Sequence, residues 1–111
     1  MTGTNALSTL AALFAVTTCC SAALAEPTLD DKGRHALETR CARCHAIGPE
    51  GKSPRSDAPP FRDIVKRYPP EDLAESLAEG IMSGHPDMPE FVLAPEEIDG
   101  VVAYLRSLLA Q

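Results

Sequence analysis

The sequence predicts a small all-α domain, because three segments after residue 25 have the periodicity of amphipathic helices and none alternates like a strand. The clearest segment starts at Pro95, and its apolar side chains recur at offsets of three and four residues: Ile98, Val101, Val102, Leu105, Leu108 and Leu109. The middle segment starts at Pro70, has Leu73, Leu77 and Ile81 four residues apart, and ends at Gly80 or Gly84.

The first helix is expected from about Leu29 to Cys44. Acidic residues at 30 and 31 fall in its first turn, where the helix dipole favours them. One side of it carries residues spaced by four, four and three positions, namely Gly33, Leu37, Cys41 and Cys44. Loops rich in Pro and Gly are expected over residues 47–60 and 84–94, with a short helical turn over 61–68. The chain thus has three main helices, and its 111 residues suffice for one domain.

Residues 1–25 are typical of a secretory signal peptide. They hold no charged side chain, end in Ala23-Leu24-Ala25 and are followed by polar Glu26. A retained membrane anchor is the alternative, but the apolar stretch is shorter than the about 20 residues of a spanning helix. A lipoprotein fits less well, because Cys19 and Cys20 follow two threonines. We expect cleavage after Ala25, a mature domain over residues 26–111, a periplasmic location and no stable membrane insertion.

Charge is distributed unevenly along the mature chain. The formal net charge of −6 divides into +2 over residues 26–67 and −8 over residues 68–111. An acidic protein is a poor candidate for binding nucleic acid or anionic membranes. We expect the separation of charge to orient the protein against its partners.

The expected core is thin. The mature chain has no Trp, and its aromatic residues are Phe61, Tyr68, Phe91 and Tyr104. A domain of this size often needs a disulfide, metal or other bound group to be stable. We therefore expect a large apolar group to complete the core and the chain without it to remain largely unfolded.

Residues 41–45 read Cys-Ala-Arg-Cys-His, which is the C-x-x-C-H pattern of c-type haem attachment. Two thiols at this spacing can add to the two vinyl groups on one edge of a haem. The adjacent imidazole of His45 is then carried to the iron as an axial ligand. The pattern therefore predicts one covalent haem c on Cys41 and Cys44, with His45 as an iron ligand.

Other uses of the two cysteines fit the sequence less well. A thioredoxin-like redox pair belongs at a helix N-terminus next to a strand, and no βαβ pattern is present. A zinc site needs a fourth ligand beside Cys41, Cys44 and His45, which only His35, His85 or a carboxylate could provide. A disulfide across two residues would be strained.

The second iron ligand is expected from the loop Gly84-His85-Pro86-Asp87-Met88-Pro89. Met88 offers a soft thioether between two prolines, which stiffen the loop and reduce the entropy lost on ligation. His85 is a competing ligand, and Met82 is the other methionine in this region. Met88 is the preferred candidate.

These residues together resemble the class I c-type cytochromes, in a small bacterial form, over essentially the whole mature chain. The resemblance implies the cytochrome c fold, with helices wrapped around one covalent haem and the N- and C-terminal helices crossing. Gly33 and Leu37 match one side of that crossing, and Tyr104 and Leu105 match the other.

The resemblance also implies a backbone partner for the axial histidine. In the family a loop proline carbonyl accepts the Nδ1–H bond of this histidine, and Ala58-Pro59-Pro60-Phe61 resembles the motif that contains it. Pro59 is thus the expected acceptor, with Pro49 as the other option. Candidates for binding the haem propionates are less well defined by the sequence: Arg55, Arg62, Lys52 and Tyr68.

The function implied is a monomeric, periplasmic single-electron carrier rather than an enzyme. Its partners would be redox proteins: a membrane oxidoreductase, an oxidase, a reductase or a dehydrogenase. One alternative is a dedicated cytochrome subunit of a periplasmic dehydrogenase complex. Another is a gas-binding or peroxidase-type haem protein, which would need a vacant or labile sixth site.

Overall fold

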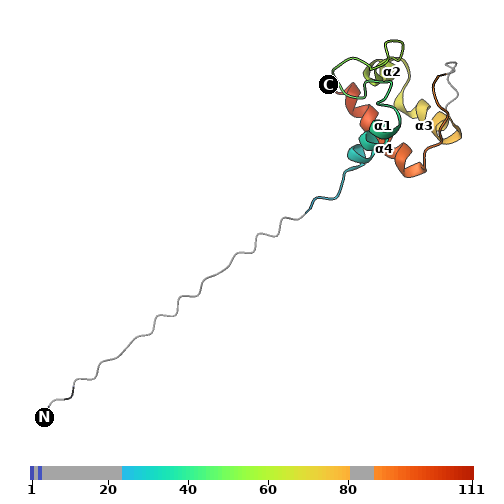
Figure 1. The fold of residues 1–111 in the computed structure, drawn as a ribbon. Helices are drawn as coiled ribbons and strands as arrows, with labels where there is room; N and C mark the ends of the chain where they lie inside the picture. The colour runs from blue at the N-terminus through green and yellow to red at the C-terminus, as the bar shows by residue number, and fades with distance from the viewer. Residues whose placement is uncertain (2, 4–23, 81–86) are drawn as a thin grey trace.

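A computed structural model describes residues 1, 3, 24–80 and 87–111 of the chain. In the described ranges, four helices follow one another along the sequence (Figure 1) and no strand occurs. The all-α prediction is confirmed. The helices are α1 (Leu29–Arg40), α2 (Phe61–Arg67), α3 (Pro70–Glu79) and α4 (Pro95–Leu109).

Helix α1 is capped at its start by reciprocal hydrogen bonds between Thr28 and Asp31. The Asp31 N–H donates to Thr28 Oγ1 at 3.2 Å, and the Thr28 N–H donates to Asp31 Oδ2 at 3.0 Å. This capping box satisfies two backbone donors that the first helical turn leaves without partners.

The prediction that this helix continues to Cys44 is wrong, because α1 ends at Arg40. Leu37 O accepts both the regular bond from Cys41 N–H and a longer-range bond from Ala42 N–H, at 2.8 and 3.0 Å. The second bond spans five residues and winds the chain out of the helix. Residues 41–45 then form a separate turn instead of extending the helical face.

Helices α3 and α4 begin as the sequence indicates, each with proline at its first position. Proline suits this position because its fixed φ is helical and its missing N–H has no partner there anyway. Helix α3 ends at Glu79 and is followed by the cap residue Gly80, whose φ of 99° lies in the left-handed region that glycine tolerates.

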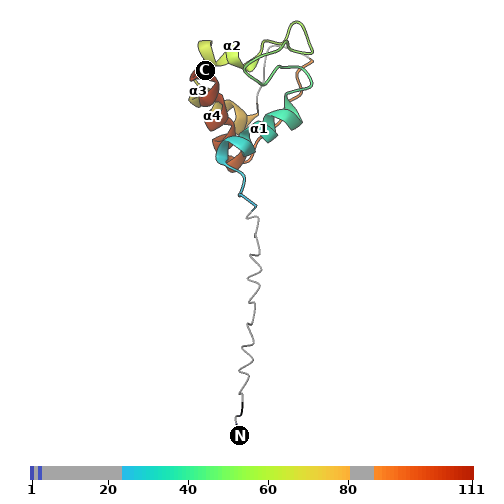
Figure 2. The ribbon, with the colours of Figure 1, turned by 90° about the vertical axis from the view of Figure 1, so that its left-hand side faces the viewer.

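Helices α1 and α4 cross each other (Figures 1 and 2). Gly33 of α1 and Gly100 of α4 lie at the point of contact. A Cβ added to Gly33 would lie 1.8 Å from the Gly100 carbonyl oxygen, and one added to Gly100 would lie 2.7 Å from Gly33 N. The two backbones are therefore in direct contact, and the expected crossing of the terminal helices is confirmed.

The core is built on this crossing. Leu37, Val101 and Leu105 are its most completely buried side chains. Val65 and Leu77, each about 5% exposed, belong to the same core and tie α2 and α3 to it. Among the described residues, no helix is both long enough and apolar enough to cross a membrane.

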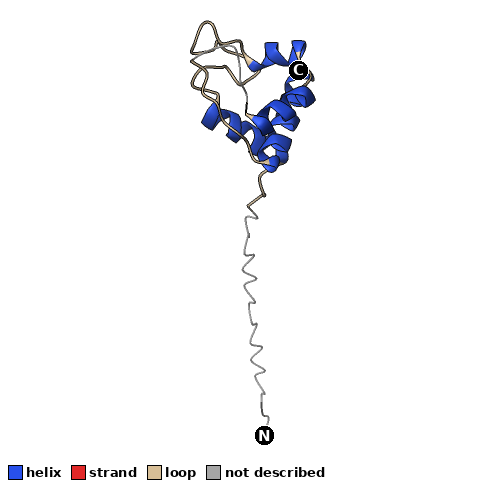
Figure 3. Cartoon of the chain, turned by 90° about the vertical axis from the view of Figure 1, so that its right-hand side faces the viewer, coloured by secondary structure: helices blue, strands red, loops and turns tan. Residues whose placement is uncertain are grey.

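The loops gather on one side of the helical cluster (Figure 3) and are tied to it by hydrogen bonds. The Tyr104 hydroxyl of α4 donates to Ile47 O at 3.0 Å, at the start of the long loop. Arg62 of α2 donates to Gly51 O at 2.7 Å. These bonds hold the loop that follows the two cysteines in a defined position.

Candidate functional site

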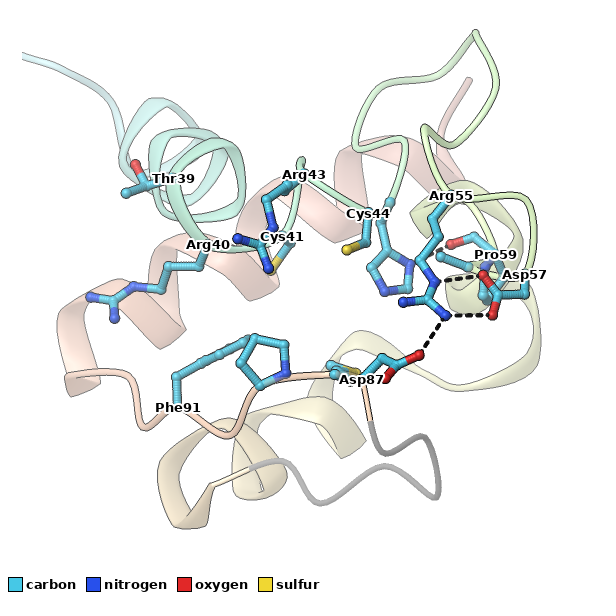
Figure 4. Close-up of a pocket in the computed structure, with 14 residues that line it drawn as sticks. Thr39, Arg40, Cys41, Arg43, Cys44, Arg55, Asp57, Pro59, Asp87 and Phe91 are labelled. Atoms are coloured by element: carbon cyan, nitrogen blue, oxygen red, sulfur yellow. Dashed lines mark hydrogen bonds and ion pairs between the residues drawn. The ribbon is translucent and has the colours of Figure 1, made fainter.

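A cavity of about 320 Å³ lies between the turn at residues 41–45 and the segment after residue 86. This volume is within the range of about 300–1,000 Å³ typical of ligand sites. The structure brings all five sequence-predicted site residues to its walls: Cys41, Cys44, His45, Pro59 and Met88. In Figure 4, Cys41 and Cys44 lie on one wall, and Asp87 and Phe91 lie on the wall opposite.

The turn after α1 places both cysteines on the cavity. Cys44 N–H and His45 N–H both donate to Cys41 O, at 3.1 and 3.0 Å. This compact turn brings the second sulfur back beside the first, and the histidine follows immediately. Cys41 is 9% exposed and Cys44 is partly buried.

The imidazole of His45 is oriented by the backbone of the following loop. His45 Nδ1 lies 2.7 Å from the carbonyl oxygen of Pro59. A carbonyl can only accept, so Nδ1 is the donor of this hydrogen bond. Engaging the ring through Nδ1 leaves Nε2 as the nitrogen that can ligate a metal. The hydrogen bond expected from the family resemblance is thus present, with Pro59 rather than Pro49 as the acceptor.

The ring of Phe61 packs near the same imidazole. The centroids of the His45 and Phe61 rings are 5.3 Å apart, with the planes inclined at 52°. The Phe61 N–H donates to Ala46 O at 2.9 Å, which joins the start of α2 to the residue after His45. The histidine is therefore held by a hydrogen bond and by packing.

The opposite wall is formed by the segment that carries Met88, which is partly buried and lines the cavity with Pro89 and Phe91. The Leu93 N–H donates to Leu77 O at 2.9 Å and fixes this segment to α3. The competing candidates, His85 and Met82, lie outside the described residues.

Ion pairs cover the rim of the cavity. Arg55 makes two hydrogen bonds to Asp57, at 2.7 and 2.9 Å, and a third to Asp87 at 2.9 Å (Figure 4). Arg40, at the end of α1, pairs with Glu97 of α4 at 2.8 Å. Both arginines line the cavity, so its rim is polar while its walls are largely apolar.

Of the four candidates for binding propionates, Arg55 alone lines the cavity. The guanidinium of Arg62 is turned to the loop carbonyl of Gly51, and Tyr68 is 58% exposed. Lys52 is exposed on the loop. These positions remove Arg62, Lys52 and Tyr68 from the cavity wall.

Sequence reasoning missed two features. Asp87 lies in the motif that offers Met88, but its pairing with Arg55 depends on how two distant loops meet. Gly100 falls within the apolar pattern of the last helix, where a glycine among larger residues marks a close approach to another backbone.

The donors on the cavity fit a haem better than a bare metal ion or a reactive dithiol. In the described ranges, no three His, Cys, Asp or Glu side chains are grouped to hold a metal ion. Burial raises the pKa of the Cys41 thiol to about 11, whereas a redox dithiol needs a lowered pKa. Two sulfurs and an imidazole with a free Nε2, facing a thioether across an apolar cavity, fit a covalently bound haem.

Comparison with known proteins agrees with this chemistry. The family model described as cytochrome C oxidase, cbb3-type, subunit III matches residues 28–105, well over half of the 111-residue chain. No curated protein and no solved structure matches the chain significantly. The matched region begins at the cap of α1 and extends into α4, so it contains the helix crossing and the whole cavity. The chain therefore belongs to the cbb3-type cytochrome c family, a family of mono-haem domains that bind haem c covalently and transfer electrons.

Proposed function

We propose that the protein is a periplasmic single-electron carrier with one haem c bound through Cys41 and Cys44 and ligated by His45 and Met88. The observation that carries this proposal is the convergence of these four side chains on one cavity. They come from two segments separated by more than forty residues, and nothing in their local sequence requires them to meet.

Haem c, when bound, supplies an iron couple whose two states differ by one electron. The protein's own contribution is to hold two ligands in place. His45 is restrained by the 2.7 Å hydrogen bond to Pro59 and by the Phe61 ring, and Met88 is restrained by the proline that follows it. Ligands that are already positioned need not move when an electron arrives or leaves, so the reorganisation that accompanies transfer is small.

Export is part of the proposal. Residues 1–25 have the composition of a cleaved signal peptide, and c-type haem is attached outside the cytoplasm. Mass spectrometry of the protein recovered from the periplasm, after expression with the c-type maturation machinery, tests both points. We expect the mass of residues 26–111 plus one haem. A full-length chain without haem would contradict the proposal.

Visible spectroscopy tests the ligands. We expect a sharp α band in the reduced protein and a weak band near 695 nm in the oxidised protein, as in the His/Met cytochromes that the sequence resembles. A reversible titration with one electron per haem should accompany these bands. Binding of carbon monoxide to the ferrous protein near neutral pH would instead indicate a gas-binding or peroxidase-type protein.

A dedicated subunit of a larger complex is the second candidate, and the family description favours it because that family is named for a subunit of an oxidase. A periplasmic dehydrogenase is another complex that such a subunit would serve. Gel filtration of a native extract separates these functions from a free carrier. Elution of the haem signal near 11.8 kDa or below supports the carrier, and elution with a large complex supports the subunit.

A further inference from the structure

We propose that Arg55 and Asp87 form a latch that holds Met88 in its ligating position, so that Arg55 is a positioning residue for the sixth iron ligand. This inference rests on the proposed ligation by Met88. The Arg55–Asp87 hydrogen bond of 2.9 Å joins the loop that follows His45 to the segment that carries Met88. It thereby connects the two walls that provide the two axial ligands (Figure 4).

The Arg55 side of the latch is anchored to the haem-attachment turn. The Arg55 N–H donates to Cys44 O at 3.2 Å, which fixes the backbone beside the second cysteine. Asp57 then accepts from Nε and from a terminal nitrogen of the guanidinium, at 2.7 and 2.9 Å. A guanidinium held by two bonds to one carboxylate has a fixed plane, so its bond to Asp87 has a fixed direction as well.

The Asp87 side restrains Met88 directly, because the two residues are adjacent. Leu93 is bonded to Leu77 O at 2.9 Å, so the segment is attached to α3 on one side of Met88 and to Arg55 on the other. Holding both ends of a short segment reduces the number of conformations in which its side chains leave the cavity. The latch therefore favours the conformation with Met88 on the cavity wall.

The expected strength of the latch is modest. The side chains of Arg55 and Asp87 are 42% and 65% exposed, and exposed ion pairs contribute little individually. Breaking the pair should raise the rate at which Met88 leaves the iron about threefold. Such a change leaves the fold intact but alters how readily another ligand enters.

The test measures binding of imidazole to the oxidised holoprotein, at concentrations where the rate no longer depends on imidazole and reports the departure of Met88. The variants are Arg55→Gln, Asp87→Asn, the double variant and Arg55→Lys. Arg34→Gln is the matched control, because Arg34 forms an exposed pair with Glu38 on α1 at 2.9 Å, outside the cavity lining. The 695 nm band and the urea midpoint are recorded for each protein.

We expect R55Q and D87N each to raise the limiting rate about threefold, and the double variant to raise it no further, since both remove the same bond. R55K should recover part of the effect. In 1 M NaCl, where screening acts within about 3 Å, the wild-type rate should approach that of the variants. The urea midpoint of D87N should match that of R34Q.

Two results would overturn the latch, and they are distinguishable. If the wild-type protein lacks the 695 nm band, Met88 is not the ligand, and both the proposed ligation and the latch fail. If the band is present but R55Q and D87N behave like R34Q, or their effects simply add, the ligation stands and the latch alone fails. D87N keeps the result interpretable if a change at Arg55 disturbs haem attachment beside Cys44.

Discussion

At the scale of single residues, the cavity depends on backbone atoms as much as on side chains. The group that orients His45 is the carbonyl of Pro59, which any residue at position 59 would provide. What proline adds is a restricted φ, which keeps that carbonyl in place. The imidazole is thus positioned by the path of the loop. The hydrogen bonds that Tyr104 and Arg62 donate to loop carbonyls fix this path and so contribute to the orientation of His45.

Substitution of Met88 tests the sixth position. Met88→Ala should abolish the 695 nm band and allow the ferrous protein to bind one carbon monoxide per haem, because the cavity wall then offers no thioether. Met82→Leu is the matched control, since it removes the other methionine of this region, and it should leave both properties unchanged. Carbon monoxide titration followed in the Soret region measures the effect. A Met88→Ala protein that still shows the 695 nm band would exclude this residue as the ligand.

The residues at the site differ in how far they could be predicted. Cys41, Cys44 and His45 are contiguous, so their chemistry is evident from a five-residue pattern. Pro59 was predicted only through the family resemblance, because its carbonyl has no signature in the sequence. The pairing of Arg55 with Asp87 could not be predicted, since it links positions 32 apart through side chains whose partners depend on the folded loops. The roles of Cys41, Cys44, His45 and Met88 toward the iron stay predictions.

At the scale of the helices, the contact between Gly33 and Gly100 is the most restrictive feature. Gly33→Ala should lower the free energy of unfolding by about 3 kcal/mol, since its Cβ would meet backbone atoms that cannot rotate away. Gly48→Ala is the control, because the nearest atom to its Cβ would be 3.9 Å away. Urea unfolding of the holoprotein measures both. Equal midpoints for the two variants would show that the helices can separate at little cost.

Carboxyl groups in the first turns of α1 and α4 make the free energy of unfolding depend on pH. Hydrogen bonds from the Thr28 hydroxyl and N–H lower the pKa of Asp31, and the Ala94 N–H together with Arg40 lowers the pKa of Glu97. A carboxyl with a lowered pKa in the folded state stabilises the fold above its unfolded pKa. That stabilisation is lost as the pH falls from about 4.5 through the folded pKa of Glu97.

Glu97→Gln should therefore lower the urea midpoint at pH 7 and make it less sensitive to acidification below pH 4.5. Glu96→Gln is the matched control, because Glu96 is an exposed residue in the same helical turn. Midpoints measured at pH 7 and at pH 3.5 give the comparison. If both variants follow the wild-type pH dependence, the bonds from Ala94 and Arg40 do not contribute to acid sensitivity.

The helices were predictable from periodicity and from Pro and Gly at their ends, which act locally. The end of α1 was not, because the pattern of Gly33, Leu37, Cys41 and Cys44 continues helical spacing beyond Arg40. The turn that follows Arg40 places both sulfurs on one cavity. This placement depends on tertiary structure and not on local helical spacing. Gly100 was likewise visible as a residue, but its contact depends on the partner helix.

At the scale of the whole molecule, the core is small and is concentrated where α1 and α4 pack together. Its buried hydrophobic residues lie mainly on α1 and α4, and no polar or charged residue is buried among the described residues. The cavity lies beside this core and is lined by Cys41 on one wall and by Met88 and Phe91 on the other. The haem is expected to provide the remaining apolar surface between the two walls.

A chain that cannot attach haem should therefore be largely unfolded. We expect the double variant Cys41→Ala/Cys44→Ala, isolated without haem, to have less than half of the helical circular dichroism of the holoprotein. The reason is the loss of apolar burial, since alanine itself favours helix formation. Far-ultraviolet circular dichroism and urea titration check this. A cooperative unfolding transition with near-holoprotein ellipticity would show that the polypeptide completes its core alone.

The crossing at Gly33 and Gly100 also constrains the order of events during biogenesis. Ribosomes and export channels deliver a polypeptide from its amino end, so α4, the main packing partner of α1, emerges well after α1 and the two cysteines. Until residues 95–109 are available, α1 lacks that packing surface, and Cys41, nearly enclosed in the finished domain, is still open to an attaching enzyme. Packing α1 against α4 thus keeps the attachment site accessible while the intervening residues are delivered.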